Sequence, residues 1–168
     1  MKTKAIFCAA LLLSLPLLPG CSASSTPKPA KDAVTLANFR SITWLRTGGY
    51  AGLHLQTRVV PGQLQFLIDP ENKKAPQRKA LSKAEMQSLL TEINAADFPK
   101  IAGKYSSPGM MDGFGDVVTL VLQEPGKKPV TFVVDSYGDK APKAFDQFLD
   151  SLYDLRKKKI PHDPNDSM

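Results

Sequence analysis

The strongest constraint on the fold is a run of alternating apolar and polar residues that turns back on itself at Pro61-Gly62. Residues 53–60 alternate before this pair, and residues 63–69 alternate after it. A period of two places every second side chain on one face of a strand, and Pro followed by Gly suits the central positions of a type II turn. Residues 41–47 have a similar strand-like pattern. We therefore expect three antiparallel strands joined as a meander.

A second Pro-Gly pair, Pro125-Gly126, joins two further apolar runs, residues 117–123 and 129–135. Both runs are rich in β-branched side chains, which favour strands. This part of the chain is therefore predicted to form a second hairpin.

Two amphipathic helices are predicted, one after each group of strands. Ser82 and Glu85 have the spacing of a capping box, and this helix is expected to end before Pro99. Asp139 is expected to cap the second helix, and residues 156–159, all basic, are expected to complement the helix dipole at its end. The apolar stripes are Met86, Leu89, Leu90 and Ile93 in the first helix, and Phe145, Phe148, Leu149, Leu152 and Leu155 in the second.

These elements predict an α+β fold, in which an antiparallel sheet of about five strands (order βββαββα) carries two helices on one face. Residues 71–79 are expected to form a surface loop, and residues 101–116 a long glycine-containing loop. We expect a single domain over residues 38–160 and a disordered tail over residues 161–168.

Composition agrees with one globular domain. The 168 residues are 42% hydrophobic, with 22 Lys and Arg against 16 Asp and Glu. Nucleic-acid binding needs a stripe or face of basic residues, which this mild excess does not provide. We therefore expect no nucleic-acid partner.

The chain begins with the layout of a secretory signal. Two lysines lie within residues 1–4, and residues 5–18 form a mostly apolar run of 14 residues. A stable transmembrane helix needs about 18 to 20 such residues, so this run is too short to span a bilayer.

The apolar run ends in Leu18-Pro19-Gly20-Cys21, and here the chain resembles bacterial lipoproteins. The resemblance implies cleavage between Gly20 and Cys21, a diacylglyceryl group on the Cys21 thiol and an acylated new amino terminus. Pro19 departs from the usual Ala or Ser. In the enteric sorting rule, Ser22 points to the outer membrane, facing the periplasm, if the host has one. The alternative is a secretory peptide or an uncleaved anchor in which Cys21 is incidental.

On this interpretation residues 1–20 are a signal peptide, and residues 21–37 are a lipidated cysteine and a flexible linker. Cys8 leaves with the signal and Cys21 is alkylated, so the mature domain has neither a free thiol nor a disulfide. Such a domain cannot be a thiol enzyme or a cysteine-ligated zinc site.

The main candidates for contact with a protein partner are aromatic and methionine side chains in or beside two glycine-rich segments. The alternative is that they cover the core as a lid. These residues are Trp44, Tyr50, Tyr105, Met110, Met111 and Phe114.

No catalytic, cofactor or metal site is predicted. The glycines of residues 48–52 lead into a strand and lack the Lys-Ser/Thr of a phosphate-binding loop. Asp112 and Asp116 supply too few oxygen ligands for a calcium loop. His54 has no cysteine partner, although Ser, Asp and His54 could still meet in space, and a two-carboxylate glycosidase stays an alternative.

The domain also resembles the emfourin type of small bacterial protein over about residues 41–156. The resemblance is carried by Arg46 leading into the glycine-rich segment 48–52, and by Asp112-Gly113-Phe114 ahead of the late hairpin. Asp116 departs from the aromatic residue that the family tends to have there. The resemblance implies inhibition of thermolysin-like metallopeptidases.

Three functions are therefore considered. The first is a membrane-anchored, non-catalytic protein-binding module of the cell envelope, held by a lipid on Cys21. The second is an emfourin-like peptidase inhibitor. The third is an enzyme with an unrecognised site.

Overall fold

The fold is described from a computed structural model. It describes residues 33–48, 52–68, 75–107, 113–138 and 140–161, all within one compact unit, Lys31–Met168. Among the predicted sites, Gly20, Cys21, Tyr50, Met110, Met111 and Asp112 lie outside these residues, as do the signal peptide, the Asp139 cap and nearly all of the tail. None of the described helices is long and apolar enough to cross a bilayer.

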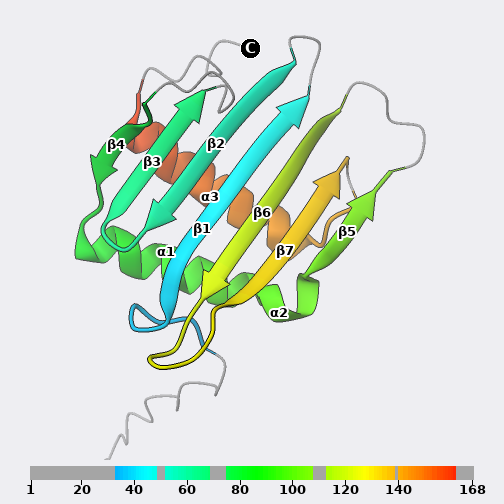
Figure 1. Cartoon of the computed structure of the whole chain (residues 1–168). Helices are drawn as coiled ribbons and strands as arrows, with labels where there is room; N and C mark the ends of the chain where they lie inside the picture. Colours follow the sequence, from blue (N-terminus) through cyan, green and yellow to red (C-terminus); the bar gives the residue numbers. More distant parts are fainter. Residues whose placement is uncertain (1–32, 49–51, 69–74, 108–112, 139, 162–168) are drawn as a thin grey trace, which may run out of the picture. The chain divides into compact units, whose positions relative to one another are not determined.

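A sheet of seven strands forms one layer of the domain, in the order β4-β3-β2-β1-β6-β7-β5 (Figure 1). All neighbouring strands are antiparallel except β5 and β7, which are parallel. The strands are β1 (Phe39–Gly48), β2 (Leu53–Val60), β3 (Gln63–Ile68), β4 (Gln77–Ala80), β5 (Gly103–Ser106), β6 (Phe114–Leu122) and β7 (Val130–Tyr137).

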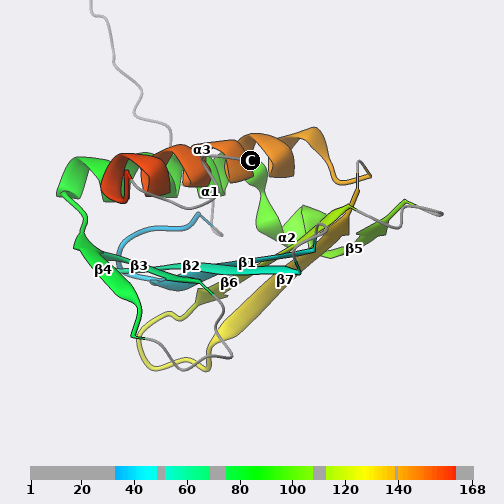
Figure 2. The same ribbon diagram turned by 90° about the horizontal axis from the view of Figure 1, so that it is seen from above.

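Three helices form the second layer, on one face of the sheet (Figure 2). They are α1 (Lys83–Ala96), α2 (Phe98–Ile101) and α3 (Lys143–Lys159). No element in the described part of the chain covers the opposite face, which we call the open face.

The predicted α+β class and both hairpins are confirmed, but the sheet is larger than predicted and mixed. β4 begins within the predicted surface loop and ends one residue after it, at Ala80, and β5 forms within the predicted long loop. All four residues of β4 are exposed, so an edge strand of this kind has no alternating pattern to reveal it. The short helix α2 was not predicted either.

The predicted first helix is confirmed. The Ser82 hydroxyl accepts a hydrogen bond from the Glu85 N–H, and the Glu85 carboxylate accepts one from the Ser82 N–H. The helix ends at Asp97, which has a φ of 53°, and Pro99 lies in the first turn of α2. α3 begins later than predicted, after Pro142, without a side-chain cap.

The core lies between the two layers. Its side chains come from residues Val34 to Ile160, and the rings of Phe98 and Phe148 meet edge to face at 5.2 Å. Val34 is buried, and its N–H donates to Asn94 Oδ1 at 2.8 Å. The predicted linker, residues 21–37, is therefore too long, because residues from Val34 onward belong to the domain.

The domain has two distinct ends, joined by the central strand. The ten residues of β1 span about 30 Å, from Phe39 to Gly48. We call the Phe39 end the tether end, because the chain joins the domain there and the β6–β7 hairpin lies beside it. We call the Gly48 end the loop end, because Gly48 pairs with Phe114, and each borders one of the two predicted glycine-rich segments.

Candidate partner-binding cleft

A cleft of about 490 Å³ opens at the loop end, between the helix-facing side of the sheet and α3. We call it the loop-end cleft. Its lining combines aromatic, apolar and charged side chains from β1, β6 and α3 with Gly138, which follows β7: Trp44, Arg46, Phe114, Asp116, Gly138, Asp146, Leu149, Asp150 and Tyr153.

Arg46 lies between two aromatic rings at the centre of this cleft. Its guanidinium carbon is 4.9 Å from the centroid of the Phe114 ring and 5.6 Å from that of Trp44. The strand geometry explains this placement, because residues two apart on β1 share a face and Gly48 pairs with Phe114. Phe114 is 41% exposed, so the outer end of the stack is open to solvent.

Asp116 is the most buried acid of the cleft, with its side chain 13% exposed, and it pairs with Arg46 across the β1–β6 ladder. Its Oδ1 accepts a hydrogen bond from Trp44 Nε1 at 2.7 Å and lies 3.3 Å from Arg46 Nε. Burial raises the pKa of Asp116, although Arg46 and the Trp44 hydrogen bond both lower it. The raised pKa means that the cost of burying the charge outweighs these two contacts.

Two further acids reach the cleft from the first turns of α3. Asp146 and Asp150 are four residues apart, so they lie on the same side of the helix. Asp146 is exposed, and the partial loss of solvent around it in the cleft raises its pKa, which the carboxylates of Asp150 and Asp116 raise further. The cleft therefore contains three carboxylates and one guanidinium, and its negative charges repel one another.

Trp44 separates the cleft from the core rather than presenting a surface. It is 2% exposed, and a second arginine, Arg156 of α3, lies 5.1 Å from the centroid of its ring. Arg156 also lies over Phe66 at 4.9 Å, and its Nη1 donates to Thr57 Oγ1 at 3.3 Å. The small side chain of Thr57, between Trp44 and Phe66 on neighbouring strands, leaves the space that Arg156 fills.

The structure brings together only part of the predicted contact cluster. Trp44 and Phe114 meet through Arg46, whereas Tyr105 lies on β5, two strands away from β6. Tyr105 is half-buried against the core and donates its hydroxyl hydrogen to the carbonyl of Ile101 at 2.9 Å. Of the candidates in the described part of the chain, only Phe114 is both exposed and part of the lining of the cleft.

Several residues of the cleft were not predicted as site residues. From the sequence, Arg46 is named only in the family resemblance, and no role is assigned to Asp146 or Asp150. Arg156 was expected to serve the helix dipole, but it is 1% exposed. Arg156 follows Leu152 of the apolar stripe by four residues. This helical spacing indicates that its side chain faces the core.

His54 and Asp116 do not form a catalytic pair, because they lie on opposite faces of the sheet. His54 lines a shallow hollow of the open face with Thr43 and Leu45, while Asp116 faces the helices. Within the described ranges, no three His, Cys, Asp or Glu side chains are grouped so that they could hold a metal ion.

The evidence for a role of the cleft residues is their own geometry. The sequence matches no protein-family model and no curated protein.

Proposed function

We propose that this protein is a lipid-anchored, non-catalytic binding module of the cell envelope, which holds a protein partner in the loop-end cleft. The observation that carries the proposal is the open Arg46–Phe114 stack beside three carboxylates. This cleft lies at the end of β1 opposite to the one where the chain joins the domain. A lipid on Cys21, in the outer membrane of a Gram-negative host, would leave the cleft facing the periplasm.

The charge of the cleft favours a partner that inserts a lysine or arginine side chain. Three carboxylates against one guanidinium give an excess of two negative charges when all are ionised. A cation placed between Asp146 and Asp150 would relieve the repulsion that raises the pKa of Asp146. The exposed Phe114 ring offers the apolar contact that the stem of such a side chain needs.

The buried acid supports the same interpretation. Ionised Asp116 costs the folded domain stability, because burial raises its pKa in spite of Arg46 and Trp44. Groups that cost stability in a cleft are candidates for function. Asp116 orients Arg46 through the ion pair and so keeps the stack with Phe114 in place.

A crosslinked pulldown from cells that carry the intact lipoprotein tests the proposal. Asp146→Asn/Asp150→Asn and Phe114→Ala should each reduce recovery of the same partner at least tenfold. Val133→Ala, on the open face and 41% exposed, is the matched control and should leave recovery unchanged. Equal recovery with all variants would contradict the cleft as the binding site.

The lipid anchor is tested separately. Cys21→Ser should leave the precursor uncut and unlabelled by a fatty-acid analogue. A mature band of normal size in this variant would contradict the anchor without touching the cleft.

A second candidate, an emfourin-like inhibitor of thermolysin-like metallopeptidases, is favoured by one observation. Arg46, Gly48 and Phe114, which carry the resemblance, meet at the loop end. Titration of a thermolysin-like peptidase with residues 22–168 decides between the two candidates. The inhibitor requires a stoichiometric loss of peptidase activity, and unchanged activity would exclude it for that enzyme.

A further inference from the structure

We propose that the tether end docks on the anionic phospholipid surface of the membrane that holds the lipid anchor. The inference depends on the proposed function for its setting, because the lipid on Cys21 brings the domain to that membrane. It adds a second interaction surface, at the end of the domain opposite to the loop-end cleft.

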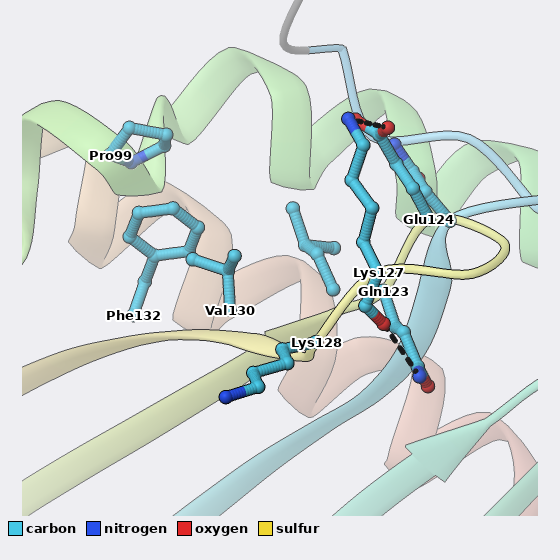
Figure 3. Close-up of a pocket in the computed structure, with 9 residues that line it drawn as sticks. Pro99, Gln123, Glu124, Lys127, Lys128, Val130 and Phe132 are labelled. Atoms are coloured by element: carbon cyan, nitrogen blue, oxygen red, sulfur yellow. Dashed lines mark hydrogen bonds and ion pairs between the residues drawn. The ribbon is translucent and has the colours of Figure 1, made fainter.

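An apolar groove of about 290 Å³ lies at the tether end, between α2 and the β6–β7 hairpin (Figure 3). Val130 and Phe132 lie side by side on β7 and face Pro99 of α2. Leu122 of β6 also lines the groove. The walls are thus apolar, while the hairpin beside them carries charge.

Two large apolar side chains are exposed at this end. Val130 is 53% exposed, the most of any large apolar residue in the described part of the chain, and Leu36 is 43% exposed. Leu36 lies in the segment that leads into β1, next to the hairpin. Side chains of this kind insert at the boundary between headgroups and acyl chains.

The charge around the groove is positive. Lys127, Lys128 and Glu124 line the groove, and Arg40 donates a hydrogen bond to Gln123 of its lining at 3.1 Å, which gives an excess of two positive charges. Lys100 pairs with Asp97 and Lys127 with Glu124 (Figure 3), and Lys128 extends from the hairpin next to Val130. Basic residues beside exposed apolar ones match an anionic lipid surface.

The chain joins the domain at this groove. Asn38 lines the groove, and its Nδ2 donates to the carbonyl of Ala33 at 3.0 Å. The Asn38 carbonyl accepts a hydrogen bond from the Gln123 N–H at 2.7 Å, which ties the incoming segment to the hairpin. The first described residue is therefore held beside the surface that we assign to the bilayer.

The length of the tether limits where the domain can be. If the residues after Cys21 form the flexible linker that the sequence predicts, the 12 residues up to Ala33 would have a root-mean-square span of about 20 Å. This is shorter than the length of about 30 Å that β1 sets between the two ends. The tether end is therefore the part of the domain that meets the bilayer most often, and the loop-end cleft points away from it.

Sedimentation with lipid vesicles tests this surface without the anchor. Residues 22–168 contain the whole described core, so this unacylated chain keeps every contact described above. We expect it to bind vesicles that contain phosphatidylglycerol, and to bind pure phosphatidylcholine at least tenfold more weakly. Raising the ionic strength from about 0.05 M to about 0.5 M should release the protein, because salt screens exposed charges. Equal binding to both vesicle types would overturn the proposal.

Matched variants locate the binding to the tether end. Lys127→Gln/Lys128→Gln should weaken vesicle binding by about fivefold for each lysine. Val130→Ser should weaken it, whereas Val133→Ser, on the same strand and 41% exposed on the open face, should not. An equal effect of the two valine variants would also overturn the proposal. Because these assays use no acyl chain and no protein partner, their failure leaves the anchor and the cleft standing.

Discussion

At the scale of single residues, the domain is organised around an alternating series of rings and guanidinium groups. Phe114, Arg46, Trp44, Arg156 and Phe66 follow one another across the helix-facing side of the sheet, with distances of 4.9 to 5.6 Å from each guanidinium to the neighbouring rings. One end of this series is exposed and the other is buried. The same pairing of ring and guanidinium therefore occurs both at the surface and in the core.

Arg156→Met tests the buried half of the series. Methionine keeps the apolar stem but removes the contacts with three rings and with the Thr57 hydroxyl, so we expect a loss of about 2 kcal/mol or more in the free energy of unfolding. Urea denaturation measures it. Arg58→Met, at an exposed position next to Thr57, should change stability by less than about 0.5 kcal/mol. Similar values for the two variants would contradict a structural role for Arg156.

Asp116→Asn tests the cost of the buried acid through its pH dependence. The pKa of Asp116 is raised above its ordinary value of 3.8, so its favourable contribution exists below pH 3.8 and is lost as the pH rises through the folded-state pKa. Asparagine keeps an acceptor for Trp44 Nε1 and never ionises. The variant should therefore gain stability relative to the wild type between pH 3 and pH 7, as measured by denaturation at each pH. A relative loss over this range would contradict the assignment.

Glu85→Gln should behave in the opposite way. The Lys159 ammonium at 2.8 Å, with the Ser82 N–H, lowers the pKa of Glu85 from 4.5 to about 2. Its contribution is complete above pH 4.5 and is lost as the pH falls through about 2, so the stability difference from the wild type should shrink over that range. A double-mutant cycle with Lys159→Gln should show coupling at pH 7 and only a small remainder of it at pH 2, where Glu85 is about half protonated. A difference that does not vary with pH would exclude this ion pair as its source.

At the scale of elements, the sequence could predict what depends on a local period. Each of the two hairpins and each of the two long helices shows its period of apolar residues within one continuous stretch of sequence. β5 becomes a strand only because its residues pair with β7, and β4 is an exposed edge, so neither has a local signal. The candidate site can be divided in the same way, into features that the sequence shows locally and features that depend on packing. The aromatic residue types were predicted, but the burial of Trp44 and the part played by Asp146 depend on how α3 packs on the sheet.

The loop end depends on a close approach of two backbone segments, which Gly48→Ala would disrupt. Gly48 has a φ of 114°, and an added Cβ would lie 2.5 Å from the Gly113 carbonyl oxygen. Gly126 has a φ of 75° but has open space around it, so Gly126→Ala tests the backbone conformation alone, at about 1 to 2 kcal/mol. Gly48→Ala should cost clearly more in thermal or urea denaturation. Equal costs would mean that the approach of Gly113 does not constrain this end.

At the scale of the whole domain, the two ends differ in charge and in the role that we propose for each. The tether end has exposed apolar side chains and an excess of positive charge, and the loop-end cleft has an excess of negative charge. The strands between them keep the ends apart by about 30 Å. On this account the domain lies on the membrane at one end and presents a binding cleft at the other.

Site-specific photo-crosslinking in living cells tests this account most directly. A photoreactive amino acid replaces Phe114 in the full-length protein, and in a parallel strain it replaces Val133, which is equally exposed at 41% on the open face. The account predicts a discrete protein adduct from position 114 that disappears with Asp146→Asn/Asp150→Asn, and no such adduct from position 133. An adduct from position 133 with none from position 114 would contradict it.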